Sequence, residues 1–268
     1  MGTETFIDYW IGQEPTPPSP TLEQMPVGVD VVPLAFVTID ESTYELDFEF
    51  LCTTHSPEAI RQAIQVVQGR GATVQLSIND QRIASVPDVD VFVENVVQNV
   101  VAWGVEGIDI DFEPPFESET LLEVTRALRP ALREALGGAE PLLTAPIYSP
   151  WLAMPSFLKS FAELLDFVTT MDYGLAEESI ELTQQYMKVI GRPEAVAIGT
   201  ICMTSPPPSP GGNNSLEEVA QMCHWEPPSG RKRGAMLYTF SYDVKTRARG
   251  GTGQGNGAYT KTIMATLP

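Results

Sequence analysis

Four acidic side chains lie close together in the stretch GVEGIDIDFEPPF, residues 104–116: Glu106, Asp109, Asp111 and Glu113. The surrounding residues are apolar and typical of a buried β-strand. Because side chains alternate between the two faces of a strand, the last three acids would share one face and the apolar residues between them would take the other. The spacing therefore predicts a row of carboxyl groups inside an otherwise apolar element.

Carboxyl groups stacked in a partly buried row cannot all ionise, because desolvation and like-charge repulsion favour the neutral form of at least one of them. A neutral carboxyl can act as a general acid, and an ionised one can stabilise positive charge. This combination suits the cleavage of an acetal such as a glycosidic bond. Two alternatives stay open: a Mg²⁺ or Ca²⁺ site built from oxygens, and solvated surface acids, although the latter do not explain the strict alternation.

The other residues that could do chemistry are few. His55 and His224 are far apart in the sequence and have no nucleophile as an evident partner, which speaks against a catalytic triad or a zinc site. The three cysteines, Cys52, Cys202 and Cys223, form no metal-binding pattern, and the sequence allows one bridge, between Cys202 and Cys223. We expect no metal and no cofactor.

Strand-like and helix-like segments alternate along the 268 residues. Strands are predicted at residues 5–10, 29–39, 72–78, 106–113, 141–148, 166–173, 195–203 and 234–242. Helices are predicted at residues 56–69, 89–103, 118–136, 177–190, from the capping box at 215–218 onwards, and at 256–268.

Eight such repeats predict an α/β fold, a single (β/α)8 TIM barrel that spans residues 1–268 as one catalytic domain. The first repeat is the weakest, because residues 11–28 are rich in proline and hold at most a short helix near 21–25. An open doubly wound sheet is the alternative, and no glycine-rich phosphate loop supports it. In the barrel the row of acids points inward and rises towards the C-terminal mouth, where Pro114-Pro115 would end the strand.

The charge of the chain restricts its partners. The formal net charge is −19 at pH 7. Such a charge repels nucleic acid and anionic membranes, so we do not expect either as a partner. No apolar run approaches the length needed to cross a bilayer. The chain starts directly in a strand-like segment, and no signal peptide is visible in it. If the protein is secreted, we expect that its leader has been removed from this sequence.

The segment EGIDIDFE resembles the D-G-x-D-x-D-x-E motif of glycoside hydrolase family 18, the family of chitinases and endo-β-N-acetylglucosaminidases. In that family the motif lies on strand four of a (β/α)8 barrel, as it does in the predicted order of strands here. Glu106 stands where many members have the first Asp, and Asp109, Asp111 and Glu113 match the motif.

Other strands resemble the family more weakly. PLAFVTI, with the pair Ala35-Phe36, is similar to the second strand, LLTAPIY to the fifth, TTMDYG to the sixth and GAMLYTFSYD to the eighth. The chain departs from the family at three places. The usual S-x-G-G of the third strand reads Ser77-Ile78-Asn79-Asp80; Tyr238 stands where many chitinases have Trp; and Gly174 follows the sixth-strand Tyr173, where an Asp is common.

The resemblance implies a substrate-assisted mechanism without a metal. Glu113 would protonate the glycosidic oxygen, and the 2-acetamido oxygen of the substrate would attack the anomeric carbon to give an oxazolinium ion, with net retention. Asp111 would hold the acetamide N–H, Asp109 beneath it would share its proton, and Tyr173 would donate to the acetamide oxygen.

Aromatic and neighbouring residues near the mouth are candidates for binding the sugar, with ordinary core packing as the alternative for each aromatic ring. They are Tyr9, Trp10, Phe36, Trp151, Met171, Asp172 and Tyr238. Trp151 is the best subsite candidate, since it lies in a predicted loop. Residues 204–214 leave room only for a loop where some family members carry an insertion domain, so we predict a barrel without that domain and an open, shallow cleft.

The resemblance thus implies a retaining, endo-type hydrolase of β-1,4 linkages next to N-acetylglucosamine, in chitin or chitooligosaccharides. Two alternatives are an endo-β-N-acetylglucosaminidase that cuts the N-glycan core and a non-catalytic carbohydrate-binding member. The expected partner is an N-acetylglucosamine-containing saccharide, and we expect a secreted monomer.

Overall fold

The computed structural model describes residues 4–12, 20–113, 117–203, 214–228, 230–245 and 256–267. One feature predicted from the sequence lies outside these residues. It is nearly all of the loop 204–214 that would stand in place of an insertion domain, and it stays a prediction. Pro114 and Pro115 also lie outside the described residues.

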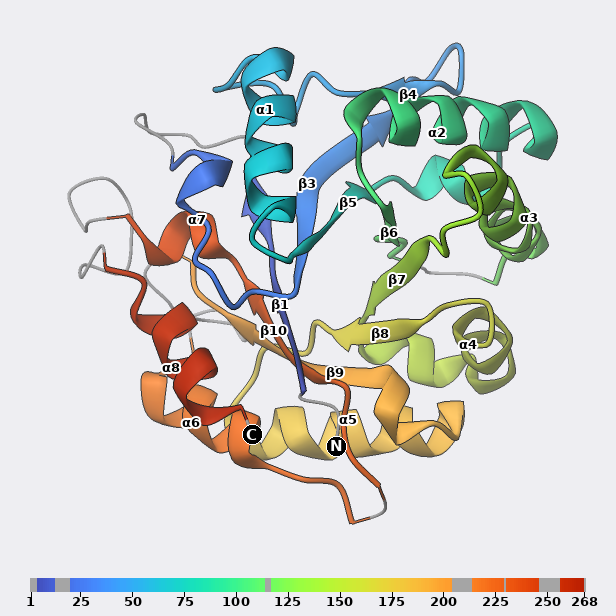
Figure 1. The fold of residues 1–268 in the computed structure, drawn as a ribbon. Coiled ribbons are helices and arrows are strands. Elements are labelled where there is room, and N and C mark those ends of the chain that lie inside the picture. Colours follow the sequence, from blue (N-terminus) through green and yellow to red (C-terminus); the bar gives the residue numbers. More distant parts are fainter. Residues whose placement is uncertain are drawn as a thin grey trace.

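The strands form a closed parallel barrel surrounded by helices (Figure 1). The barrel strands are β1 (Thr5–Asp8), β2 (Trp10–Ile11), β3 (Val31–Ile39), β5 (Thr73–Ile78), β6 (Gly107–Ile110), β7 (Leu142–Ile147), β8 (Phe167–Thr170), β9 (Val196–Ile201) and β10 (Gly234–Tyr238). Their order is β1-β10-β9-β8-β7-β6-β5-β3-β2, and pairing of β1 with β3 closes the ring. Because β1 and β2 follow one another in the first predicted strand, the ring has the eight predicted positions, and the TIM barrel is confirmed.

The helices lie outside the strands, as a parallel barrel requires. The α-helices are α1 (Pro57–Gln68), α2 (Val89–Trp103), α3 (Glu119–Ala135), α4 (Pro155–Ala162), α5 (Ala176–Ile190), α6 (Leu216–His224), α7 (Phe240–Asp243) and α8 (Ala258–Thr266). The 3-10 helices are η1 (Leu22–Gln24), η2 (Gln81–Ala84), η3 (Ser149–Ala153) and η4 (Pro193–Ala195).

The helix ends follow the local signals in the sequence. The Ser56 side chain accepts the N–H of Ala59 at the start of α1, and Ser215 with Glu218 forms the predicted capping box of α6. Helices α2 and α5 end at Gly104 and Gly191, which have φ values of 69° and 75°. Glycine adopts this left-handed backbone at little cost, which is why both helices stop there.

Several elements differ from the sequence prediction. The fourth strand is shorter than predicted, because regular pairing ends at Ile110, although the N–H of Asp111 still donates to Ile78 O at 2.9 Å. The eighth strand ends at Tyr238 and is followed by the short helix α7, where strand was predicted through residue 242. Helix α4 and the two-residue strand β4 (Leu46–Asp47), antiparallel to β3, were not predicted.

The apolar core has two parts. A large cluster fills the space between the barrel and the helices, and a smaller one lies inside the barrel, with Ile7, Val31, Phe167 and Met236 among its members. The strands approach closely at Gly107, where an added Cβ would lie 2.0 Å from Leu142 O. A side chain cannot be accommodated there, which explains the glycine within the acidic motif.

The cysteines form no bridge in the structure. Cys202 and Cys223 are buried free thiols, and Cys52 is a half-buried free thiol, so the suggested pairing of Cys202 with Cys223 is wrong. Burial is the largest influence on Cys223 and raises the pKa of its thiol to about 11. In the part of the chain that the structure describes, no helix is both long and apolar enough to span a membrane.

A second pair of buried carboxyl groups joins β1 to the C-terminal helices. Asp8 and Asp243 are both fully buried, and the Thr260 hydroxyl lies 3.2 Å from Asp8 Oδ2 and 2.9 Å from Asp243 Oδ2. The N–H of Phe240 donates to Asp8 Oδ1 at 2.9 Å. Burial, and then the neighbouring Asp243, raise the pKa of Asp8 well above its usual range.

We predict that Asp8→Asn becomes more stable relative to the wild type as pH rises. A carboxyl whose pKa is higher in the folded state destabilises that state increasingly as pH rises from its unfolded pKa, about 3.9, to its folded pKa. The substitution removes this penalty, so the free energy of unfolding of the variant, relative to that of the wild type, should rise with pH. Urea denaturation of both proteins between pH 4.5 and 8 measures the difference. Asp88→Asn, at the exposed cap of α2, controls for the loss of one charge. A difference between Asp8→Asn and wild type that does not vary with pH would refute the prediction.

Candidate active site

The three acids form a row that passes from the barrel interior to its surface at the C-terminal end of β6. Asp109 is fully buried within β6, Asp111 is 4% exposed just beyond the strand, and Glu113 is exposed. This is the arrangement predicted from the alternation of the sequence. The row therefore lies at the end of the barrel where the loops that follow the strands meet.

Asp109 is surrounded by hydroxyl groups from three other strands. The Tyr9 hydroxyl and the Ser77 hydroxyl donate to Asp109 Oδ2 at 2.8 and 2.7 Å, and the Thr144 hydroxyl donates to Oδ1 at 2.7 Å. Burial raises the pKa of Asp109, and these three bonds oppose that effect. Three donors make Asp109 the better site for a negative charge within the row.

Asp111 has a different environment. The Asn79 amide donates to Asp111 Oδ2 at 2.6 Å, and among the described residues the buried Oδ1 has no hydrogen-bond partner. Burial, followed by the charge of Asp109, raises the pKa of Asp111 well above its usual range, and Glu113 adds to the rise. Asp109 thus receives three donors and Asp111 only one, and Oδ1 is the oxygen of Asp111 that has no protein partner among the described residues.

Glu113 occupies the exposed end of the row. The side-chain amide of Gln81 in η2 donates to the main-chain oxygen of Glu113 at 3.0 Å, so the backbone is held while the carboxyl group faces outward. Burial and the charges of Glu113 and Asp111 raise the pKa of Tyr148. For Tyr173 burial is again the largest cause of a raised pKa, and Glu113 is among the smaller ones. Both phenols thus lie within the electrostatic reach of Glu113.

A continuous row of aromatic rings lies beside the acids. Tyr173 stacks on Tyr238 with ring centres 6.4 Å apart, Tyr238 stacks on Phe36 at 6.3 Å, and Phe36 lies 6.2 Å from Phe50. All four rings are partly exposed. Phe36 reaches this place because the register of β3 shifts between Ala35 and Val37, and such a bulge redirects a side chain. Partly exposed aromatic faces of this kind can stack on the apolar face of a sugar ring.

Two residues predicted to bind the sugar are fully buried elsewhere. Trp151, in η3, stacks on Phe157 at 5.5 Å and on Phe161 at 5.1 Å, and Phe112 meets it edge-on. Its ring is therefore part of the core outside the barrel. The prediction of a subsite at Trp151 is wrong, because the residues after β7 form a 3-10 helix that turns the indole inward.

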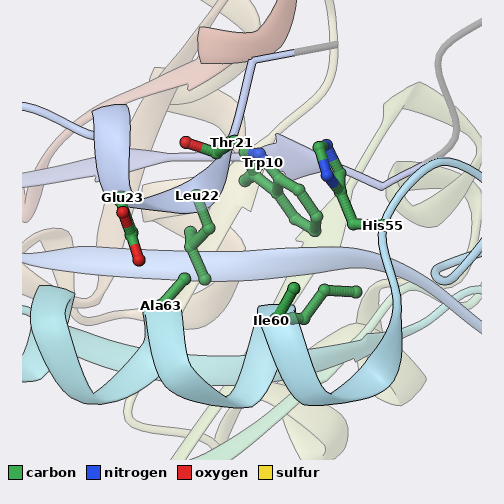
Figure 2. A pocket seen from close by; sticks show the side chains of 8 residues that line it. Trp10, Thr21, Leu22, Glu23, His55, Ile60 and Ala63 are labelled. Atoms are coloured by element: carbon green, nitrogen blue, oxygen red, sulfur yellow. The ribbon is translucent and has the colours of Figure 1, made fainter.

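Trp10 also faces outward from the barrel. Figure 2 shows its ring beside His55, between η1 and α1, where a cavity of about 100 Å³ remains. The indole N–H donates to Pro20 O at 3.0 Å, and the ring is fully buried. Tyr9, the preceding residue, points into the barrel by alternation, is 2% exposed, and contacts Asp109. Neither ring offers a face to a sugar, contrary to the prediction for both.

The remaining predicted residues have mixed positions. Met171 is partly exposed and packs with the aromatic rings inside the barrel. The Asp172 carboxyl accepts the Tyr186 hydroxyl at 2.5 Å and the N–H of Ser149 at 2.9 Å, so it joins β8 to its neighbours. Glu106 accepts the N–H of Val74 at 3.1 Å and takes no part in the row of acids.

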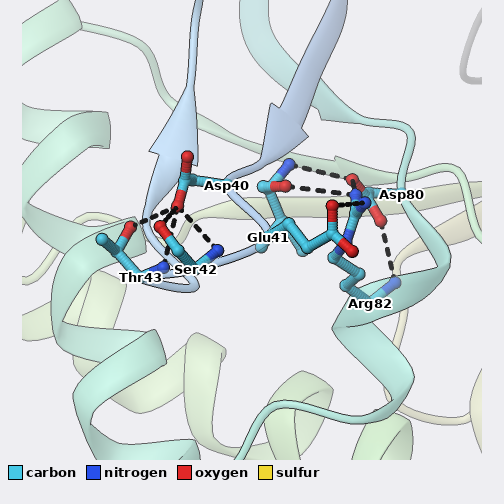
Figure 3. A network of polar contacts seen from close by, with 7 residues as sticks. Asp40, Glu41, Ser42, Thr43, Asp80 and Arg82 are labelled. Atoms are coloured by element: carbon cyan, nitrogen blue, oxygen red, sulfur yellow. Dashed lines mark hydrogen bonds and ion pairs between the residues drawn. The ribbon is translucent and has the colours of Figure 1, made fainter.

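The loop after β5 is held firmly beside the acids. The Asp80 side chain accepts the N–H of Ile39 at 3.0 Å and forms an ion pair with Arg82 at 2.8 Å, and Arg82 also donates to Ile39 O (Figure 3). Next to it, Asp40 closes its own turn by accepting from Ser42 and Thr43. These contacts tie the β3–β4 hairpin to the segment that carries Asn79.

Some residues of the site were not identified from the sequence. Ser77 and Asn79 were noted only as part of a departure from the family pattern, and Thr144, Tyr148 and Phe50 were not singled out. Period-two alternation places Thr144 and Tyr148 on the inner face of the fifth strand, so that signal was present. Phe50 lies in an irregular segment, where no periodicity predicts the direction of a side chain.

The described residues contain no group of three or more His, Cys, Asp or Glu side chains placed to hold an ion. Two of the acids that such a site would need differ strongly in surroundings, since Asp109 is enclosed by hydroxyl groups and Glu113 is exposed.

Comparison with known proteins identifies the family. Residues 5–200 match the model of the endo-β-N-acetylglucosaminidase EndoS TIM-barrel domain. The chain belongs to this family, and with it to glycoside hydrolase family 18. It is therefore a glycoside hydrolase by family. A comparison with curated protein sequences gave no significant match.

Solved structures of family 18 chitinases share the fold. A chitinase from Pseudoalteromonas aurantia superposes with a TM-score of 0.75 at 18% identity, covering 98% of this chain and 100% of that one. The class V chitinase of Nicotiana tobaccum gives 0.73 at 14% identity and covers 99% of both chains. A chitinase from Cycas revoluta in complex with (GlcNAc)3 gives 0.71 at 14% identity, covering 98% of this chain and 99% of that one.

We predict that Trp151→Ala acts on stability and not on sugar binding. Removing a fully buried Trp side chain should lower the free energy of unfolding by about 3–5 kcal/mol. Leu175→Ala, at a side chain that is 63% exposed, is the control and should change stability little. Chemical denaturation measures both. A stable Trp151→Ala variant with weakened saccharide binding would restore the subsite interpretation.

Proposed function

We propose that this protein is a retaining glycosidase that cleaves the β-1,4 bond following an N-acetylglucosamine residue by substrate-assisted catalysis. The observation that carries the proposal is the graded burial of the row: a fully buried, triply hydrogen-bonded Asp109, a nearly buried Asp111 and an exposed Glu113. In such a row the three groups can take different roles: Asp109 can hold a buried negative charge, Asp111 can stabilise positive charge, and Glu113 can donate a proton.

In the first step Glu113 gives its proton to the glycosidic oxygen, and the bond between that oxygen and the anomeric carbon breaks. The acetamide oxygen of the same sugar forms a bond to the anomeric carbon, which gives an oxazolinium ion, while the leaving saccharide departs with its hydroxyl restored. Asp111 accepts the acetamide N–H and offsets the positive charge, as its proton passes towards Asp109.

In the second step the Glu113 carboxylate takes a proton from a water molecule, which attacks the anomeric carbon. The bond to the acetamide oxygen breaks, so the product keeps the β configuration, Glu113 is protonated again, and the proton shared with Asp109 returns to Asp111. Tyr173 donates to the acetamide oxygen in this scheme, which its place beside Tyr238 and within reach of Asp111 supports. Phe36 and Tyr238 supply the apolar surface under the sugar.

For the substrate, chitin or chitooligosaccharides are our first candidate, and the fold shared with the chitinases is consistent with it. The N-glycan core is a second candidate, because the family model that matches residues 5–200 is that of an endo-β-N-acetylglucosaminidase domain. The two substrates share the same N-acetylglucosamine disaccharide, so one mechanism serves both. A polymeric substrate such as chitin also favours an extracellular protein.

We predict that Glu113→Gln lowers kcat by several orders of magnitude while the fold stays intact, because the variant lacks the proton donor and its side chain is exposed. The assay uses chitopentaose, with products identified by mass, and circular dichroism checks the fold. Exposed Glu117→Gln, four residues further along the chain, is the matched control and should keep full activity. Equal activity of wild type and Glu113→Gln would exclude Glu113 as the acid.

We predict that wild type releases products from chitopentaose, and the same assay on a high-mannose glycopeptide tests the second candidate. Cleavage of the glycopeptide alone, between the two core sugars, would assign the endo-β-N-acetylglucosaminidase activity and reject the first candidate. Saccharide binding without cleavage of either substrate would reject the enzymatic proposal in favour of a carbohydrate-binding protein.

A further inference from the structure

The end of β5 and the segment that follows it run beside the row of acids, and every second residue of one faces the corresponding residue of the other. Strands β5 and β6 are parallel and in register, with Ser77 opposite Asp109. Three hydrogen bonds continue this register, each between residues 32 positions apart in the sequence, with lengths of 2.7, 2.6 and 3.0 Å. The three pairs are Ser77 with Asp109, Asn79 with Asp111, and Gln81 with the main-chain oxygen of Glu113.

The middle pair differs from the other two in what it reaches. The side-chain amide of Gln81 donates to the main-chain oxygen of Glu113, and Ser77 shares Asp109 with two further hydroxyl groups. Asn79 instead donates to one oxygen of Asp111, and Oδ1 on the same carboxyl group has no hydrogen-bond partner among the described residues. The Asn79 amide thus determines which of the two oxygens is left for a proton or for the substrate.

We infer that Asn79 is a positioning residue for the reaction: its amide holds Oδ2 of Asp111, leaves Oδ1 as the oxygen without a protein partner, and stabilises the carboxylate form of Asp111 when positive charge develops. The predicted effect on catalysis rests on the proposed function. Asn79 stands where the S-x-G-G pattern of the family has a glycine, and a glycine would have no side chain to donate this hydrogen bond.

The ionisable groups around Asp111 explain why the single hydrogen bond from Asn79 should have a measurable effect on the pKa of Asp111. Asp111 is faced by Asp109 and Glu113 on its own segment, by Tyr9 from the first strand, and by Tyr148 and Tyr173 at the ends of β7 and β8. Each of these side chains is either neutral or negative. Burial and the two carboxylates raise the pKa of Asp111, and the bond from Asn79 acts in the opposite direction.

We predict that Asn79→Leu raises the pKa of Asp111 and lowers kcat about 10-fold or more, with a smaller change in KM. Leu has nearly the same size as Asn and no donor, and one hydrogen bond to a charged group is worth about 10- to 100-fold in rate. The pKa of Asp111 is measured by NMR titration of protein labelled with ¹³C at the Asp carboxyl groups, assigned with Asp111→Asn. Activity is measured on chitopentaose or on the glycopeptide, whichever the wild type cleaves.

Gln81→Leu is the matched control for the titration. It exchanges an amide for an aliphatic side chain in the same loop but removes only a bond to a main-chain oxygen, so the titration of Asp111 should stay as in the wild type. Asn79→Gly serves as a second variant without a donor if Asn79→Leu does not fold. The same upward shift is expected in both Asn79 variants.

The outcomes separate this inference from the proposed function. An Asp111 titration that is unchanged in folded Asn79 variants overturns the inference, whatever the activity of the wild type. A shift in titration with a wild type that cleaves neither substrate supports the electrostatic role of Asn79 and rejects the enzymatic proposal. A shift in titration together with an unchanged kcat overturns the catalytic part of the inference.

Discussion

Burial of a negative charge inside the barrel is the constraint on which the site depends. Asp109 lies where water does not reach, and an ionised carboxyl group is costly there unless donors surround it. Tyr9, Ser77 and Thr144 supply those donors from three different strands. The interior of the barrel is therefore an apolar cluster with a compact polar centre, and that centre is stable only when the strands keep their register.

Register also explains how the acids acquire different properties while lying on one short segment. Asp111 comes two residues after Asp109 and receives its donor from the loop after β5, whereas Glu113 is past the end of the strand and exposed. From Asp109 to Glu113 the number of protein donors falls and the exposure to solvent rises. The gradient arises from the geometry of a strand end together with the donor from the loop after β5.

The buried pair Asp8 and Asp243 shows that the same chain tolerates a carboxyl cluster for a structural purpose. It joins β1 to α7 and α8 through Thr260 and main-chain donors. A buried acid in this fold is thus not by itself a sign of catalysis. The position of the row at the C-terminal mouth, beside partly exposed aromatic rings, distinguishes the acids of the site.

The sequence alone determined the barrel, most helix ends and the row of acids, because period-two alternation, capping residues and glycine act over a few neighbouring positions. The tertiary structure decided which side chains accompany the row. Trp151 turns into the core and Phe50 comes to the mouth, since the direction of a side chain in an irregular segment depends on what packs against it. The bond from Asn79 to Asp111 joins residues 32 positions apart, and only the pairing of β5 with β6 brings them together.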